Sequence, residues 1–181
     1  MAIAASNIKL RISGSSASAT DPNGSYGGAM STVSGGIIVT NVLNNDMDDI
    51  TSAEASSGIT IFHAYYYKNE HATLTYIAPK FYIDTITSSG DTQIYMALCA
   101  EAKNTAVQRL SAETGSGSAT PPVDPPTSVT FSSPGNYAGG IAIGNLDAAD
   151  YRGIWVKYVV GSSASAVLDQ YTLGIQGDSN P

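Results

Sequence analysis

The sequence predicts an all-β fold, an antiparallel β-sandwich of jelly-roll or Greek-key type with long loops and an extended N-terminal arm. Runs of β-branched and aromatic residues recur along the 181-residue chain, separated by clusters of Gly, Pro, Asn and Ser. Only 13% of the residues are charged while 43% are hydrophobic, a composition that favours strands and turns over solvated helices. No segment shows a clear amphipathic helical pattern, although residues 44–55 and 104–110 could each supply a turn or two.

The N-terminal part combines one strand with a long arm. Residues 8–12 alternate apolar and polar side chains, as expected for a strand with one buried face. Residues 14–36 are rich in Ser, Ala and Gly, so we expect a loop or arm that a neighbouring subunit can order. We expect a single domain, in which residues 37–181 form the sandwich and residues 1–13 contribute a strand to it.

The middle of the chain carries the strongest strand signal. Residues 59–68 are β-branched or aromatic almost throughout, which predicts a central strand. Residues 74–83 continue in this style, and Pro79 predicts an edge position or a bulge there. The turn at residues 88–91 predicts a hairpin between this strand and the next one, at residues 92–99.

The C-terminal part begins with a Pro-rich connector, residues 121–126, which we interpret as an extended loop within the domain. Its role stays open. Further strands are expected after it, two of them short and two longer and alternating, at residues 129–131, 140–143, 153–160 and 171–175.

The formal net charge of −7 argues against nucleic-acid or membrane partners, because both are bound mainly through Lys and Arg. The N-terminus lacks the pattern of a secretion signal, and no later run approaches the length of a membrane helix, so we expect synthesis in a cytoplasm. The single cysteine, Cys99, cannot form an internal disulfide and is expected to be a small buried hydrophobic residue.

Motifs for catalysis are absent from the sequence, so we expect neither an enzyme nor a cofactor. No G-x-S-x-G elbow occurs, His63 lies in the aromatic strand where packing is the simpler interpretation, and His71 is expected in an exposed turn. Asp84 and Asp91 have no spacing that singles them out as a glycosidase pair. The acidic run 44–49 is the best candidate for a metal, but it lacks the glycine and distal glutamate of an EF-hand, so we interpret it as a polar or helix-capping turn.

Aromatic residues are the best candidates for contacts. The three tyrosines in the run 65–67 cannot all face one side of a strand, so a second surface must cover one or two of them, either a facing sheet or another subunit. The residues that we expect to take part in interactions are Ile3, Tyr26, Met30, Tyr65, Tyr66, Tyr67 and Trp155.

The order of several short motifs resembles a group of small virion proteins of tailed bacteriophages. These motifs are Gly27-Gly28-Ala29-Met30-Ser31, Ala53-Glu54-Ala55, Tyr66-Tyr67-Lys68-Asn69, Pro134-Gly135-Asn136-Tyr137, Tyr151-Arg152-Gly153-Ile154-Trp155-Val156-Lys157 and Leu173-Gly174-Ile175-Gln176-Gly177-Asp178. The similarity extends from about residue 27 onward, and it is carried by the order and spacing of the motifs.

This resemblance implies a β-sandwich capsid decoration, or cement, protein on the outer surface of the phage head. Its expected partners are the major capsid protein and further copies of itself, with a trimer favoured because capsid lattices offer three-fold positions. The arms at residues 1–6 and 14–36 are expected to reach neighbouring subunits. Three alternatives stay open: a tail or baseplate component, a carbohydrate-binding adhesin module with Tyr or Trp155 around a groove, and, least favoured, a hydrolase.

Overall fold

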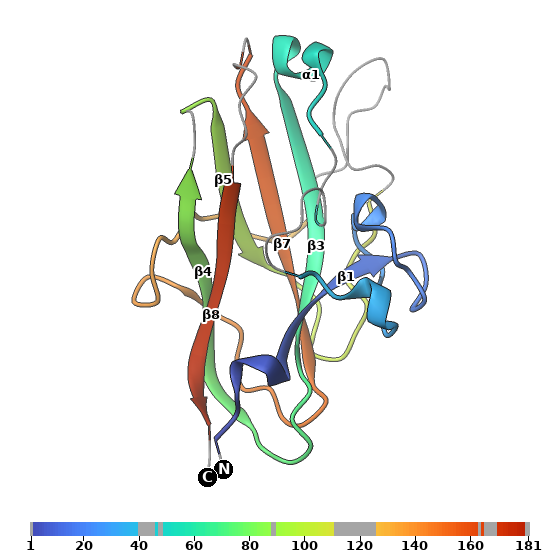
Figure 1. Cartoon of the computed structure of the whole chain (residues 1–181), viewed down its shortest axis with the longest axis vertical. Helices are drawn as coiled ribbons and strands as arrows, with labels where there is room; N and C mark the ends of the chain where they lie inside the picture. The colour runs from blue at the N-terminus through green and yellow to red at the C-terminus, as the bar shows by residue number, and fades with distance from the viewer. Residues whose placement is uncertain are drawn as a thin grey trace.

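A computed structural model of the chain describes residues 2–39, 46, 49–87, 90–110, 126–162, 164 and 170–179. These residues form two antiparallel sheets, one of five strands and one of three, that pack face to face as a β-sandwich (Figure 1). The predicted fold class is therefore confirmed. Of the predicted Pro-rich connector, residues 121–125 lie outside the described residues.

The five-stranded sheet has the order β2-β1-β3-β7-β5. The bounds are β1 (Ile8–Gly14), β2 (Ala29–Met30), β3 (Ile59–Asn69), β5 (Thr92–Leu98) and β7 (Tyr151–Val160). Strand β3 lies in the centre, as predicted, and pairs with β7 along ten residues, from Ile59 opposite Val160 to Lys68 opposite Tyr151. Pairing on both sides suits its β-branched and aromatic composition.

The three-stranded sheet has the order β6-β4-β8, with β4 (Tyr76–Thr87), β6 (Ile141–Ala142) and β8 (Gln170–Ser179). The register between β4 and β8 shifts between Ile77 and Lys80, which confirms the bulge predicted at Pro79. Proline cannot donate a ladder hydrogen bond, and its neighbour Ala78 adopts a positive φ of 47°.

The predicted hairpin between residues 74–83 and 92–99 is wrong. Strands β4 and β5 belong to different sheets, and β5 pairs with the free edge of β7 instead. The physical reason is burial on two sides: Met96 packs in the core between the sheets, while Ala97 packs on the opposite face of the same strand. The five-stranded sheet is covered on both faces by described residues, so a strand within it can bury both side chains.

The helical segments are short. Helix α1 (Ser52–Ser57) begins with a capping box between Thr51 and Glu54 and ends at Gly58, whose φ is 78°. Single 3-10 turns are η1 (Ala5–Asn7), η2 (Pro22–Gly24) and η3 (Ser34–Gly36). Residues 104–110 do not form a helix. They run past the arm, where Val107 makes an isolated bridge with Gly28.

Two short segments pair with the five-stranded sheet only through isolated bridges. In residues 37–39, Ile37 bridges Arg11 and the Ile38 N–H donates to the Leu10 carbonyl at 2.9 Å. Residues 129–131 are not a strand, but the following residue, Ser132, exchanges two backbone hydrogen bonds with Met96. These segments therefore close the margins of the five-stranded sheet without extending it by a full strand.

The five-stranded sheet has a hydrophobic cluster on each face. The sheet-covered face, which includes Tyr65 and Val156, packs against the three-stranded sheet, whose β4 residue Phe81 belongs to the same cluster. The loop-covered face lies on the other side, where Tyr66 and Trp155 pack against the irregular segments around residues 26–30, 99–110 and 129–131. The described loops thus supply the second layer that alternation in β3 requires.

The arm at residues 14–36 folds back onto its own chain (Figure 1, blue). The Ser31 N–H donates to the Ile12 carbonyl at 3.0 Å, and the Thr32 N–H donates to the Ala17 carbonyl at 2.8 Å. Arg11 of β1 donates two further hydrogen bonds to the carbonyls of Ser31 and Val33. Contacts within one chain therefore order the arm, and its contact with neighbouring subunits stays a prediction.

Candidate functional site

The structure distributes the predicted contact residues over both faces of the five-stranded sheet. On the loop-covered face lie Tyr26, Met30, Tyr66 and Trp155, and on the sheet-covered face lie Ile3, Tyr65 and Tyr67. Of these seven residues, Ile3 and Tyr26 are half-buried. The side chains of the other five are buried within the chain itself. Those five belong to the core of the sandwich, and any contact with a partner stays a prediction.

Tyr66 attaches two loops to the sheet. Its hydroxyl donates to the Gly28 carbonyl and accepts from the Val107 N–H at 2.8 Å. Burial raises the pKa of this phenol well above its usual value. Gly28 has a φ of 99°, and a Cβ there would lie 2.2 Å from the Gly14 carbonyl oxygen, so only glycine allows the arm to approach this closely.

A second group of polar side chains is enclosed at the sheet-covered face. His63 Nδ1 lies 3.0 Å from the Tyr65 hydroxyl, which donates to the Asp46 carbonyl at 2.7 Å. The Asp46 carboxylate in turn accepts from Tyr158 and Tyr171. Burial, followed by the neighbouring Tyr65 and Asp46, raises the pKa of Tyr158 well above its usual value.

This second group holds Asp46 against the sandwich. His63 is fully buried and hydrogen-bonded, which confirms the simpler interpretation of this residue. In the acidic run 44–49, only Asp46 and Asp49 are among the described residues, so the predicted polar turn lies largely outside them. Within the described ranges, no three His, Cys, Asp or Glu side chains are grouped so that they could hold a metal ion.

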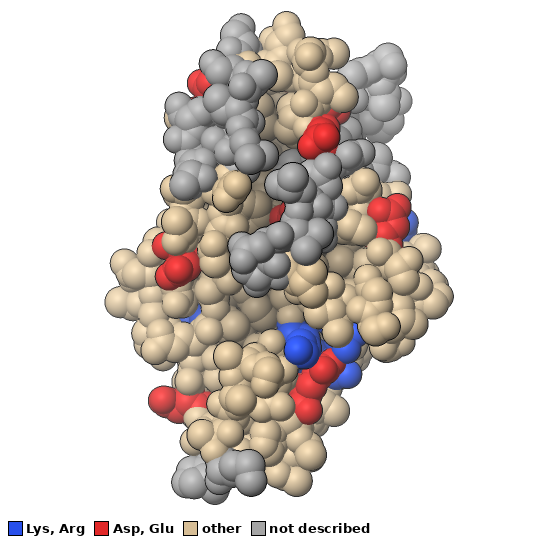
Figure 2. All heavy atoms as spheres, viewed as in Figure 1, with Lys and Arg blue, Asp and Glu red and all other residues tan. Residues whose placement is uncertain are grey.

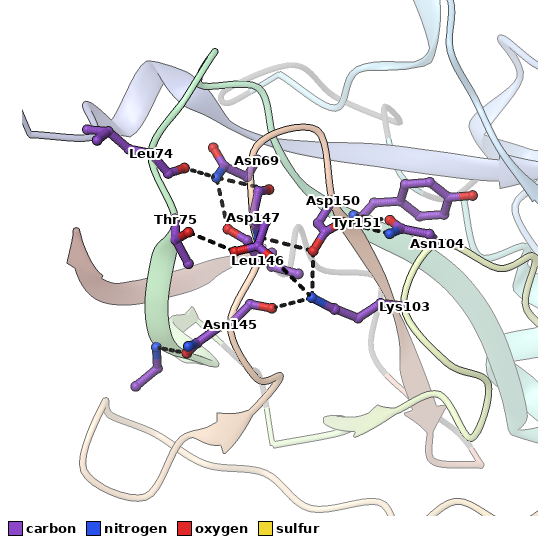
Figure 3. Close-up of polar contacts among 11 residues, drawn as sticks. Asn69, Leu74, Thr75, Lys103, Asn104, Asn145, Leu146, Asp147, Asp150 and Tyr151 are labelled. Carbon is purple, nitrogen blue, oxygen red and sulfur yellow. Dashed lines mark hydrogen bonds and ion pairs between the residues drawn. The ribbon is translucent and has the colours of Figure 1, made fainter. Parts of the chain in front are cut away.

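The third polar group joins two turns at one end of the sandwich (Figure 3). Asn69, the last residue of β3, is fully buried. Its amide nitrogen donates to the carbonyls of Leu74, Leu146 and Asp147 at 2.8, 2.9 and 3.2 Å, and its amide oxygen accepts from the His71 N–H at 3.0 Å. One asparagine therefore fixes both the turn after β3 and the turn before β7.

A surface ion pair reinforces this end. The Lys103 ammonium lies 2.5 Å from Asp150, whose other carboxylate oxygen accepts from Asn104 at 2.6 Å (Figure 3). Burial alone would raise the pKa of Asp150, but the hydrogen bonds from Lys103, Asn104 and the Asp147 N–H together lower it below its usual value. The network also includes a 2.7 Å hydrogen bond from Thr75 to Asp147.

Beside this network lies a hollow of about 350 Å³, lined by Lys68, Glu70, His71, Ala72, Ala148 and Ala149. This hollow lies between the turn after β3 and the turn before β7. None of these residues was predicted from the sequence to take part in a binding site. The sequence feature that could have indicated this site is its charge. Lys9, Arg11 and Lys68 are three of only eight Lys and Arg residues in the chain, and the pairing of β1 with β3 brings them together.

His71 takes a more specific position than the exposed turn that was expected. Its ring is half-buried, and Nδ1 accepts from the N–H groups of Thr73 and Leu74 at 3.2 and 3.0 Å. Because Nδ1 is an acceptor, the neutral ring carries its proton on Nε2. The ring is thus held as part of the wall of the hollow, with a fixed tautomer.

Comparison of the chain with known protein families, curated proteins and solved structures gave no match. Among the residues that the structure describes, none of the helices combines the length and the apolar character that a membrane span requires.

Proposed function

We propose that this chain is a non-catalytic structural subunit of a tailed-bacteriophage virion, and that it decorates the outer surface of the head. The order of the sequence motifs suggests this assignment, and the contacts that the motif residues make support it. The proposed partners are the major capsid protein and other copies of the chain, in a trimer.

The observation that carries the proposal is the position of the motif residues at the points where loops are attached to the two sheets. Gly28 and Tyr66 join the arm to residue 107, and Asn69 joins the two turns at the end of the sandwich. Arg152 donates to the Cys99 and Glu101 carbonyls, which attaches the segment after β5. The Pro134 carbonyl accepts from the Ile83 N–H at 2.8 Å.

Residues that attach loops to the sheets keep the surface of the protein in a fixed shape. A cement protein needs such a scaffold, because it must present extended surfaces in fixed positions to several neighbours at once. The scarcity of charged residues, 13% of the chain, also suits broad contacts that depend on packing and backbone polarity.

Cryo-electron microscopy of purified particles from the phage that encodes the chain tests the proposal. We expect density for the sandwich in many symmetric copies on the outside of the head, grouped around three-fold positions. Density confined to the tail, in a low copy number, would support the baseplate alternative. Absence from the particle would exclude a virion role altogether.

A further inference from the structure

The hollow between the turn after β3 and the turn before β7 combines positive charge with a fixed shape. Lys9 lies directly opposite Lys68 in the β1–β3 register, so the two side chains leave the same face of the sheet. Like charges placed opposite one another are unfavourable unless an anion lies near them. In a chain with a net charge of −7, this concentration of cations is local, and one face of the molecule shows cationic and acidic atoms side by side in one place (Figure 2).

The one acidic side chain of the hollow is already neutralised. Glu70 Oε1 accepts from Arg11, which is buried, and lies 3.8 Å from the Lys68 ammonium. Arg11 makes its remaining described hydrogen bonds to the arm. Two cations therefore face one carboxylate here, and Lys68, with a 23% exposed side chain, is the cation that lines the hollow.

The hydrogen-bonding groups of the hollow are mixed. Lys68 supplies N–H donors, and the His71 Nε2–H has no acceptor among the described residues. On the acceptor side, Glu70 Oε2 takes no hydrogen bond from any described group. Ala72, Ala148 and Ala149 add small apolar surfaces. A simple carboxylate would use only the donors, whereas a ligand with both a carboxylate and hydroxyl groups would also use Glu70.

We propose that this hollow binds an acidic sugar, with its carboxylate on Lys68 and His71 and a hydroxyl group donating to Glu70. The hollow is open to solvent, and its volume of about 350 Å³ is large enough for one sugar unit lying at the surface. The turns on both sides are held by the buried Asn69, so binding needs little ordering of the protein. This site is separate from the aromatic contact residues Tyr26, Tyr65, Tyr66, Tyr67 and Trp155, and it does not depend on a role in the virion.

NMR titration of the full chain with glucuronate tests the proposal, with glucose and acetate as the comparison ligands. We expect glucuronate to shift the amide signals of residues 68–72 and 148–149 and to bind roughly tenfold more tightly than either comparison ligand, since each of them lacks one half of the interaction. Equal binding of acetate would overturn the assignment to a sugar. An absence of shifts at these residues would overturn the site.

Two variants make the test specific. Lys68→Gln should weaken glucuronate binding roughly tenfold, whereas Lys9→Gln, which removes an equal charge opposite Lys68 but outside the hollow, should change it by less than about twofold. An equal loss of glucuronate affinity in both variants would mean that the ligand is attracted by the overall positive charge of this region, and it would overturn the specific site. Ala148→Leu, on a half-buried turn position, should block the hollow while the sandwich stays folded, and unchanged binding in this variant would also overturn the proposal.

Discussion

The two faces of the five-stranded sheet are buried equally well but by different means. On the sheet-covered face, Tyr65 and Val156 meet the regular strands β4 and β8. On the loop-covered face, Tyr66 and Trp155 meet segments that, apart from the two-residue strand β2, contain no strand or helix. Both tyrosines are 0% exposed, so irregular backbone can exclude water as completely as a second sheet.

The difference lies in how each cover is attached. A sheet satisfies its own backbone hydrogen bonds, so it needs only complementary apolar side chains to pack. A loop has unpaired N–H and C=O groups that require partners. The Tyr66 hydroxyl provides such partners for Gly28 and Val107, whereas the Tyr67 hydroxyl on the opposite face is buried without a partner among the described residues.

The largest effect should come from removing a large side chain from either core. We expect Trp155→Ala on the loop-covered face and Phe81→Ala in β4, which packs against the sheet-covered face, each to lower the free energy of unfolding by about 3–5 kcal/mol, because both residues are at most 1% exposed. Urea denaturation followed by circular dichroism measures both. A loss below about 1 kcal/mol for Trp155→Ala alone would show that the loops are not a packed layer.

Alkaline pH should weaken both faces together. Burial raises the pKa of Tyr76 to about 12 and those of Tyr66, Tyr67 and Tyr158 further, from a usual value of 10.0. The neutral phenols therefore stabilise the fold fully below pH 10, and this stability is lost as the pH rises through 10 towards the folded pKa values. For Tyr67 and Tyr158 together we expect a loss of about 3 kcal/mol by pH 11.

Absorbance of tyrosinate near the alkaline unfolding transition checks this expectation. The protected tyrosines should ionise in one step with unfolding, after the exposed ones. Separate ionisation of Tyr66 before unfolding, detected through a Tyr66→Phe variant, would show that the loop-covered face opens first.

A smaller difference in stability should distinguish substitutions of the neighbouring residues Tyr66 and Tyr67. Tyr66→Phe removes the group that bonds Gly28 and Val107, so we expect a loss of about 1–2 kcal/mol. Tyr67→Phe removes a hydroxyl that is buried without a described partner, so the matched variant should be neutral within about 0.5 kcal/mol or slightly stabilising. Thermal unfolding of the two variants side by side is sufficient, and a reversed order of stability would contradict the hydrogen-bonding assignment.

The same contrast explains what the sequence could predict. Strands β1, β3, β7 and β8 follow from period-two alternation or β-branched runs, and the bulge at Pro79 follows from the chemistry of proline. The run of three tyrosines predicted a second covered surface, because alternation is a local property.

Features that depend on distant partners could not be predicted. The pairing of β5 with β7 is set by burial of Met96 and Ala97 on opposite faces, and the neighbouring β4 was a reasonable but wrong choice. The hollow arises only when Asn69 connects its own turn with residues 146–147, which lie 77 and 78 positions away. Such contacts between distant parts of the chain have no local signature.

Amide hydrogen exchange tests most directly whether the loop layer is a fixed part of the fold, which is the premise of a structural role for the motif residues. We predict that the amides of Val107 and Leu110, which donate to the Gly28 and Tyr26 carbonyls, exchange as slowly as those of β3 and β7, through global unfolding only. Exchange of these two amides orders of magnitude faster, while β3 and β7 stay protected, would show that the loops open on their own and would contradict the account.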